Sequence, residues 1–327
     1  MLVSLGIIAL NEESYLPELL EDIISQSFPL KNIDLLLIDS ISTDKTKEIM
    51  EEFRQEHTKQ FHNIRVLENA GKWQANGWNV FINHADGDIL IKVDAHSHIP
   101  EDFVTSLVEG LENSEYGVLG GKRPTILKDN SLWSRILLEA ENALFGSGIA
   151  IFRTSDTPRL VKSVFHGAYK KEVFRIAGVF DEKLRRTEDN EIHYRILKHG
   201  FKIMYNPGII SYQYARPTLR KMIKQKFLNG YWIGKTAWYC PNCLSLYHFI
   251  PFCFVLSLLV SSVLVVKIPF FLICLGTMYG LFDVLNSFIS ILKHKNVAML
   301  VLMFLFPMLH IAYGLGTLLG LVSKRIK

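Results

Sequence analysis

The sequence predicts an α/β protein with a doubly wound, mainly parallel sheet, followed by an interface helix and C-terminal transmembrane helices. Two observations predict this architecture. Strand and helix patterns alternate over residues 1–96, as in a parallel sheet covered on both faces. Charge then almost disappears, with four charged residues in 244–322 against 61 in 1–243. This change of composition excludes both a purely soluble enzyme and a disordered chain.

Hydrophobic spacing places the individual elements. Apolar runs such as IDLLLIDS predict buried strands, and a one-sided apolar pattern such as ESYLPELLEDIISQ predicts a helix. The first strand is expected to end at Asn11, the next three to cover residues 33–40, 64–69 and 88–96, and the helices to cover 13–26, 43–57 and 73–85. Thr43 or Asp44 is the expected cap of the second helix. Further strands are expected in 115–124 and 201–214, and further helices in 131–146 and 190–200.

Polar side chains gather where the predicted strands end, which is where ligands bind in such sheets. Asp39 could bond a base or a ribose hydroxyl, since it lies too early in the chain to cap the following helix. Lys72 lies among small residues in ENAGKWQANGWN and could meet a phosphate, although the segment is neither a Walker loop nor a GxGxxG fingerprint.

The segment VDAH closes the fourth predicted strand. Asp94 and His96 are two positions apart, so in extended backbone they point the same way and could hold one cation. A carboxylate suits Mg²⁺, and an imidazole leans toward Mn²⁺ or softer metals. The alternative is a capped loop with a chance histidine.

A second acidic motif is TEDNEIHYR, in which Glu188 and Asp189 begin a helix after Thr187. Acidic residues favour helix N-termini for electrostatic reasons alone. One of these carboxylates could instead deprotonate a hydroxyl as a general base.

Positive charge is concentrated beside the apolar region. Residues 1–215 sum to −7, residues 216–243 to +6 and residues 244–327 to +5. This distribution favours anionic membrane lipids as partners and argues against nucleic acid. Aromatic and basic residues alternate in 217–238, which predicts an amphipathic helix or helix pair in the membrane interface.

Three apolar stretches, 244–266, 268–292 and 297–322, are long enough to span a bilayer. If all three span, the basic tail SKRIK lies opposite the N-terminal domain, against the positive-inside tendency. Pro307 could break the last stretch and return the tail, so two or three spans remain open. The expected domains are 1–215, 216–243 and 244–327.

Six segments together resemble the family-two glycosyltransferases of the GT-A fold, and most closely the succinoglycan-type exopolysaccharide glucosyltransferases with a membrane C-terminus. These segments are IIALNEE, IDSISTDKT, ENAGKWQANGWN, VDAHSHIP, FHGAYKKEVFRIAGVFDE and TEDNEIHYR. The resemblance covers residues 1 to about 240. It implies roles for the following residues: Leu10, Glu12 and Asp39 for the nucleotide, Asp94, Ala95 and His96 for diphosphate and metal, Asp189 with Glu188 for catalysis, and His166 and Asp181 for the acceptor side.

The implied activity is inverting, metal-dependent transfer of a hexose, with UDP as the nucleotide by family habit. The acceptor would be a hydroxyl of a lipid-linked glycan in cell-surface polysaccharide synthesis. The protein itself would be a multi-pass protein of the cell membrane with a cytoplasmic catalytic domain. Two departures from the family pattern are Asp94-Ala95-His96 in place of DxD and the lack of the QxxRW motif of processive synthases. The alternatives are a polyprenyl-phosphate monoglycosyltransferase and a non-catalytic membrane partner.

Overall fold

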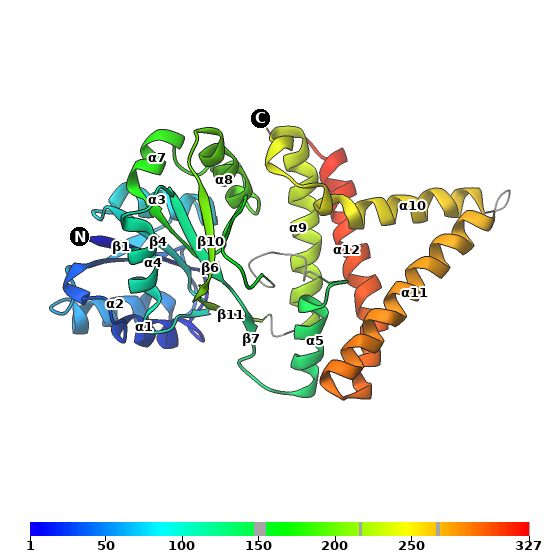
Figure 1. The fold of residues 1–327 in the computed structure, drawn as a ribbon, viewed down its shortest axis with the longest axis horizontal. Coiled ribbons are helices and arrows are strands. Elements are labelled where there is room, and N and C mark those ends of the chain that lie inside the picture. Colours follow the sequence, from blue (N-terminus) through cyan, green and yellow to red (C-terminus); the bar gives the residue numbers. More distant parts are fainter. Residues whose placement is uncertain (147–154, 216–217, 266–268, 327) are drawn as a thin grey trace. The chain divides into compact units, whose positions relative to one another are not determined.

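The computed structural model describes residues 1–146, 155–215, 218–265 and 269–326 (Figure 1). The chain forms two compact units. The first contains Met1–Ile126 and Ile151–Tyr214, and the second contains Leu127–Ala150 and Ala215–Lys327. The segment Leu127–Ala150, which the sequence pattern places within domain 1–215, therefore groups with the C-terminal helices.

The first unit is built on a mixed eight-stranded sheet with the order β3-β2-β1-β4-β9-β6-β10-β8. Its strands are β1 (Val3–Ala9), β2 (Ile33–Asp39), β3 (Asn63–Glu68), β4 (Ile89–Asp94), β6 (Val118–Lys122), β8 (Arg159–Leu160), β9 (Gly167–Lys170) and β10 (Ile203–Ile210). The first four strands are parallel, and β9 pairs antiparallel with both β4 and β6. The predicted doubly wound half is therefore followed by a mixed half.

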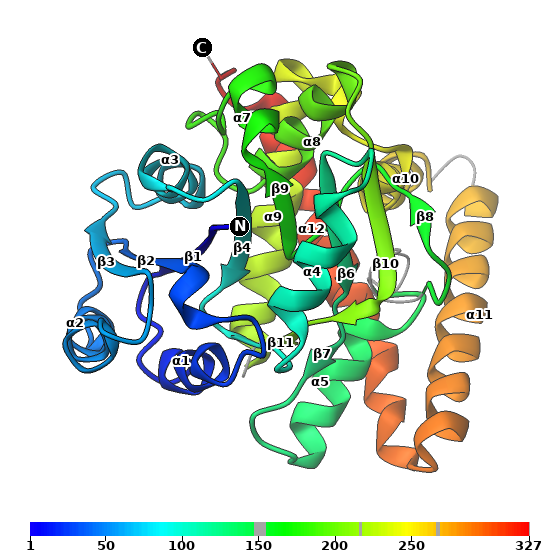
Figure 2. The ribbon, with the colours of Figure 1, turned by 60° about the vertical axis from the view of Figure 1, so that its left-hand side comes forward.

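Helices cover both faces of this sheet. Figure 2 shows α1 (Leu16–Ile24) and α2 (Thr46–His57) on one face and α3 (Gln74–His84) on the other. Alternate residues of β1 and β2 point into the core beneath α1, α2 and α4 (Phe103–Glu112). Other residues of β2 and β4 pack with α3, α7 (Lys171–Ala177) and α8 (Glu188–Lys198). This sandwich fixes the carboxyl ends of the parallel strands at one edge of the sheet.

Several element boundaries differ from the sequence expectations. The first strand ends at Ala9, because Asn11 adopts a left-handed φ of 56°. Helix α2 begins at Thr46 after Lys45, so neither Thr43 nor Asp44 is its N-cap. The single strand expected at 201–214 is divided into β10 and β11 (Tyr212–Tyr214), with a register shift between Asn206 and Ile210. Strand β11 then joins β5 (Ser97–His98) and β7 (Thr125–Ile126) in a second, three-stranded sheet.

The second unit is helical. It contains α5 (Leu132–Asn142), α9 (Leu219–Tyr239), α10 (Ile250–Leu264), α11 (Pro269–His294) and α12 (Leu302–Val322), with short 3-10 turns at Pro241–Cys243, Leu246–Phe249 and Val297–Val301. Among the described residues, three segments are long and apolar enough to cross a membrane: Leu246–Leu264, Pro269–His294 and Val297–Val322. The expected interface region forms one helix, α9, which lies beside α12 (Figure 1).

Helix α5 is held to the end of α11 by one buried carboxylate. Glu139 accepts hydrogen bonds from Ser290 Oγ at 2.9 Å and from Lys293 Nζ at 2.8 Å, and its Oε2 lies 2.8 Å from His294 Nε2. The apolar face of α5, with Ile136 and Leu137, packs in the same core as α12. This explains why the segment joins the second unit although both of its neighbours in sequence belong to the first.

Candidate active site

The loops that follow β1 and β2 are tied together at the carboxyl edge of the sheet. The Thr43 amide donates to Asn11 Oδ1 at 2.8 Å, and the Asn11 amide donates to Ser42 Oγ at 3.0 Å. Asp39 is 1% exposed, and its carboxylate accepts the Ser42 amide at 3.2 and 3.3 Å. Asp39 thus stabilises the turn after β2, a local role that the sequence pattern did not indicate. Asp39 lies at the carboxyl end of β2, as the sequence predicts.

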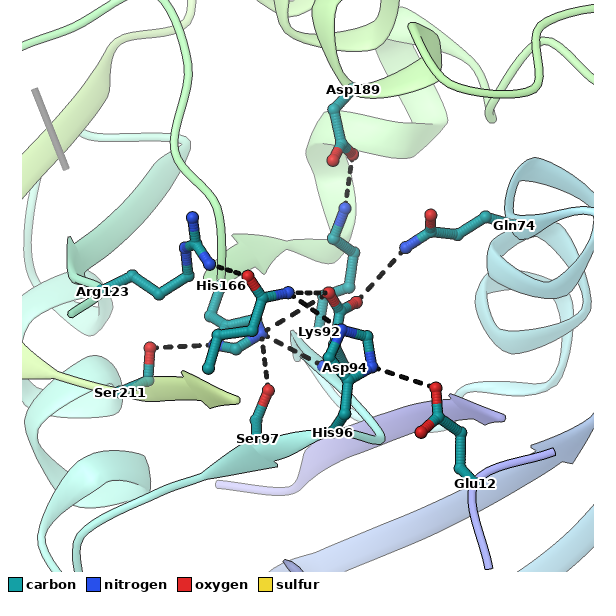
Figure 3. Close-up of polar contacts among 11 residues, drawn as sticks. Glu12, Gln74, Lys92, Asp94, His96, Ser97, Arg123, His166, Asp189 and Ser211 are labelled. Atoms are coloured by element: carbon teal, nitrogen blue, oxygen red, sulfur yellow. Dashed lines mark hydrogen bonds and ion pairs between the residues drawn. The ribbon is translucent and has the colours of Figure 1, made fainter. Parts of the chain in front are cut away.

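Strand β4 brings three polar side chains to this edge at alternate positions. Lys92, Asp94 and His96 follow one another in steps of two along β4 and the turn after it. Figure 3 shows Asp94 and His96 in one network with residues from distant parts of the chain, and Lys92 in a separate pair with Asp189. Lys92 was not among the predicted site residues. The step of two was the signal that could have identified it.

Asp94 and His96 converge on one amide nitrogen. Gln213 Nε2 lies 3.4 Å from Asp94 Oδ2 and 3.1 Å from His96 Nε2, while Gln74 Nε2 donates to Asp94 Oδ1 at 3.2 Å. His96 Nδ1 lies 3.1 Å from Glu12 Oε1, an arrangement that leaves the Nε2 lone pair directed toward Gln213. A carboxylate oxygen and an imidazole nitrogen that share one partner are a suitable donor pair for a cation.

These two ligands fit a metal ion that a bound phosphate compound also coordinates. Among the described residues, no group of three or more His, Cys, Asp or Glu side chains is placed to hold a metal ion. Mg²⁺ is commonly held by one or two protein carboxylates together with substrate phosphates. Asp94 and His96 therefore fit a divalent cation whose remaining ligands come from a diphosphate and water, and they do not form a complete protein cage.

A buried arginine fixes this arrangement from below. Arg123 is 2% exposed, stacks on Phe165 with its Cζ 3.9 Å from the ring centroid, and bonds Gln213 Oε1 through its Nη1. This contact orients the Gln213 amide so that its nitrogen faces Asp94 and His96. Neither Arg123 nor Gln213 was predicted, because each lies far from the β4 motif in sequence.

His166 lies beneath Asp94. Its Nε2 accepts the Asp94 amide at 3.2 Å, and its Nδ1 lies 2.8 Å from Ser211 Oγ. Burial lowers the pKa of His166 to about 3, against the attraction of Asp94, so the ring is neutral near pH 7. The resemblance placed His166 on the acceptor side. Its 2% exposure and its bonds to Asp94 and Ser211 place it against the end of β4, and its role on the acceptor side stays a prediction.

The carboxylate of Asp94 is kept ionised by its surroundings. Burial would raise its pKa, but attraction to His166, His96, Lys92 and Arg123 holds that pKa below the usual range. Lys92 and Arg123 supply positive charge to Asp94 near pH 7. An ionised Asp94 is the form that a cation requires.

Asp189, in the first turn of α8, faces β4 and forms an ion pair with Lys92 through its Oδ1. The Lys92 side chain is 5% exposed, with Nζ 4.9 Å from the Trp78 ring centroid and 5.4 Å from that of Phe180. Burial would lower the pKa of Lys92, but the Asp189 charge raises it above its ordinary value. The Asp189 side chain is 27% exposed, so it is both anchored by a cation and accessible to a substrate.

Glu188, the neighbouring acid, has a different environment. It is 3% exposed, and its Oε2 has no hydrogen-bond partner among the described residues. Burial, and then the Asp189 charge, raise the pKa of Glu188 to about 7. Asp189 is therefore the member of the pair that can meet a substrate, and Glu188 is a buried neighbour.

Replacing Glu188 with glutamine is expected to make the protein less sensitive to rising pH. The pKa of Glu188 is 4.5 for the free group and about 7 in the folded protein, so the folded protein holds this proton more tightly than the unfolded chain does. The resulting contribution to the free energy of unfolding is fully present below pH 4.5 and is lost as pH rises through 7. Glu188→Gln should match the parent at pH 5 and exceed its free energy of unfolding at pH 8 by up to about 3 kcal/mol. Melting temperatures in detergent from pH 5 to pH 9 measure this, and equal slopes would contradict it.

Replacing Lys92 with methionine is expected to lower stability and turnover together. Breaking one side of a buried ion pair costs about 3–5 kcal/mol. A displaced Asp189 should reduce kcat roughly 10²-fold with little change in the donor KM. Melting curves and steady-state kinetics of Lys92→Met and Lys92→Arg measure both effects. A raised donor KM with unchanged kcat would instead mean that Lys92 acts on the diphosphate.

The structure also describes the setting of the remaining predicted residues. Leu10 is 48% exposed just after β1. Ala95 is 1% exposed and packs in the core, so only its backbone is available to a ligand. Lys72 is exposed and has a left-handed φ of 62°, an uncommon backbone conformation for a residue with a side chain. Asp181 lies in the turn before α8, where its Oδ1 accepts the Lys183 amide at 3.0 Å.

Comparison with known proteins supports the family resemblance drawn from the sequence. The family described as glycosyl transferase family 2 matches residues 4–177. The chain is 28% identical over 315 residues to the dolichyl N-acetyl-alpha-D-glucosaminyl phosphate 3-beta-D-2,3-diacetamido-2,3-dideoxy-beta-D-glucuronosyltransferase of Methanococcus voltae, with 95% of each chain covered. It is also 28% identical over 229 residues to the succinoglycan biosynthesis protein ExoA of Rhizobium meliloti, covering 69% of this chain and 66% of that protein.

A solved structure shows the same fold. The mannosyltransferase PcManGT from Pyrobaculum calidifontis, determined in complex with GDP-Man and Mn²⁺, has a TM-score of 0.61 at 16% identity. The similarity covers 99% of this chain and 88% of that one. The predicted α/β domain of GT-A type, followed by apolar helices, is thereby confirmed.

Proposed function

The chain belongs to glycosyl transferase family 2 and is a glycosyltransferase, and on this premise we propose that it moves a sugar from a nucleotide-diphosphate sugar to a hydroxyl of a lipid-linked glycan. The observation that carries the proposal is a pair of carboxylates of different environment, both within electrostatic range of the Lys92 ammonium. Asp94, with His96, suits a cation and diphosphate, and Asp189 is an accessible acid held by Lys92. Transfer to a hydroxyl needs both functions.

Asp189 acts as the base in this proposal. Its Oδ1 is held by Lys92, and it accepts the proton of the acceptor hydroxyl as that oxygen attacks the anomeric carbon. The new glycosidic bond forms while the bond from the sugar to the diphosphate breaks on the opposite face, so the configuration inverts. The proton stays on Asp189, and the electron pair leaves with the nucleoside diphosphate.

The donor end is stabilised by the residues around β4. Asp94 and His96 would hold a divalent cation, Mg²⁺ or Mn²⁺, which offsets the charge that develops on the leaving diphosphate. Lys72, on its exposed loop, adds a second positive charge there. Leu10, Glu12 and Asp39, at the ends of β1 and β2, would contact the base and ribose of a nucleotide such as UDP.

The relatives support a membrane acceptor. The Methanococcus enzyme is named for transfer to dolichyl N-acetyl-glucosaminyl phosphate, a lipid-linked sugar, and ExoA for succinoglycan biosynthesis. Three apolar helices in the same chain would keep the site beside such an acceptor. We place the protein in the cell membrane with its catalytic domain on the cytoplasmic side, where nucleotide sugars are available.

The test is donor hydrolysis and transfer by the detergent-purified full chain, with a panel of nucleotide sugars and with Mg²⁺, Mn²⁺ or EDTA. One donor should be consumed and activity should disappear in EDTA. A lipid-linked sugar with a free hydroxyl and a bare polyprenyl phosphate are offered as separate acceptors. Product from the bare phosphate alone would replace the proposal with a polyprenyl-phosphate monoglycosyltransferase. Failure to bind any donor in the presence of metal would overturn the proposed function.

A further inference from the structure

Helix α9 and helix α12 form one parallel pair with a constant register. Trp238 Nε1 donates to the carbonyl of Leu321 at 2.9 Å, an offset of 83 residues. The same offset relates Gly234 to Thr317 and Gly230 to Tyr313, which face each other across the pair. With this offset of 83, the bounds of α12, Leu302–Val322, correspond to those of α9, Leu219–Tyr239. The two helices therefore lie side by side over their whole length.

The two backbones approach so closely that side chains are excluded between them. A Cβ atom on Gly230 or Gly234 would overlap a carbonyl oxygen of α12, and one on Gly316 or Gly320 would overlap a carbonyl oxygen of α9. Glycines spaced by four on both helices are the pattern that permits such contact. The pair therefore behaves as one body, and the position of α9 in the membrane determines that of α12.

Helix α9 is too charged to cross a bilayer. Its cations occur along most of its length: Arg220, Lys221, Lys224, Lys226 and Lys235. Cations near the helix ends can reach the headgroups, but Lys226 lies well inside the helix, where a charge in hydrocarbon is strongly unfavourable. Lys235 has its Nζ 5.2 Å from the Trp232 ring centroid, in the aromatic and basic composition of an interfacial helix.

The exposed surface of α12 is a single apolar stripe. Its large exposed side chains are Phe304, Met308, Ile311, Leu315, Leu319 and Val322, in steps of three or four. The residues between them are buried or half-buried, with Gly316 and Gly320 toward α9 and Gly314 toward α10. By contrast, the large exposed side chains of α11 cover a much wider arc of that helix, and its buried residues are the polar Asp283, Ser287 and Ser290. A one-sided apolar stripe suits a helix that lies along a membrane.

The basic tail stays with the same pair. Arg325 stacks on Trp238 of α9, with its Cζ 4.6 Å from the ring centroid. Because α9 follows directly after the first unit, its lipid surface is the one on the catalytic side of the membrane. A tail bound to α9 is therefore on that side as well.

We propose that α12 does not span the membrane although its length and composition would allow it. It lies in the interface with α9, its apolar stripe among the acyl chains and the cations of α9 and of the tail at anionic headgroups. Only α10 and α11 enter the bilayer, as a hairpin, and both ends of the chain stay on one side. The inference does not depend on which donor or acceptor the enzyme uses.

The test measures depth along α12 in the full-length chain. Cys240, Cys243, Cys253 and Cys274 are replaced by serine, and single cysteines at Phe304, Ile311 or Leu319 carry a fluorophore. The protein is reconstituted in phosphatidylcholine and phosphatidylglycerol vesicles with quenchers at two lipid depths. The three sites should give equal, shallow depths. Matched sites at Ile273, Leu281 and Leu292 on α11 should give different depths, with Leu281 the deepest.

A second measurement tests the side of the tail. Lys324→Cys and Glu52→Cys, an exposed position on α2, are labelled with a membrane-impermeant maleimide in sealed vesicles of either orientation. Both should label in the same orientation. A depth maximum at Ile311, or labelling of the two cysteines in opposite orientations, would overturn the proposal and establish α12 as a third span. Donor hydrolysis by each variant verifies that it is folded.

Discussion

Asparagine in place of Asp189 is expected to reduce sugar transfer by about 10³-fold while leaving donor affinity nearly unchanged. A positioned general base typically contributes 10²–10⁴-fold. The asparagine amide retains the shape of the side chain but cannot take the acceptor proton. Asp189 touches Lys92 and no residue of the donor-metal group among the described contacts, so the donor Kd should change less than about threefold. Transfer to a lipid-linked sugar and calorimetric binding of the nucleotide diphosphate measure the two quantities.

Glu188→Gln is the matched control for this replacement. Glu188 is adjacent in sequence but buried, so its neutral variant should retain most of the transferase activity at pH 7. If Asp189→Asn retained activity toward a lipid-linked sugar, no base would be required and Asp189 would lose its assigned role. If Glu188→Gln were the inactive variant, the roles of the two acids would be exchanged.

Alanine in place of Asp94 is expected to abolish metal-dependent donor binding and to lower activity by at least about 10³-fold. The replacement removes the only carboxylate of the proposed donor pair, and His96 alone is a weak site for a hard cation. Electron paramagnetic resonance should detect protein-bound Mn²⁺ in the parent with nucleoside diphosphate, and this bound signal should be missing in Asp94→Ala. Addition of EDTA to the parent should reproduce the loss of activity.

His96→Asp is the informative companion variant, because it supplies a second carboxylate where the sequence departs from DxD. Activity should persist, and the ratio of Mg²⁺-supported to Mn²⁺-supported turnover should rise, since Mg²⁺ prefers oxygen ligands. An active Asp94→Ala variant that ignores EDTA would show that the charge on the diphosphate is neutralised by lysine and arginine alone.

Sequence patterns were most informative where structure repeats locally. The first four strands and their helices follow from hydrophobic period, and the strand ends place Asp39 and Asp94 correctly at one edge. Strand β9 was missed because its four residues are too short to show a period, although it joins the two halves of the sheet. The step of two from Asp94 could have indicated Lys92 as a site residue, but a single lysine in an apolar strand does not show which acid it will meet.

Long-range partners account for the other differences. Gln213 reaches Asp94 across 119 residues and Arg123 reaches Gln213 across 90, and no local spacing encodes either contact. Helix α12 satisfies every compositional rule for a membrane span, so its sequence alone cannot reveal that a charged helix lies against its whole length. In our proposal the position of α12 at the membrane is determined by α9, whose residues lie 83 positions earlier in the chain.

The placement of α5 imposes an order on folding during synthesis. Its anchor, Glu139, must wait for Lys293, which is 154 residues further along the chain. At ordinary translation rates that interval is on the order of ten seconds. Throughout it, the ribosome-bound chain presents the apolar side of α5, with Ile136 and Leu137, to water while α9 and the hairpin are still being made. We therefore expect the nascent protein to need a chaperone or the membrane surface to shield this segment until the last helix is complete.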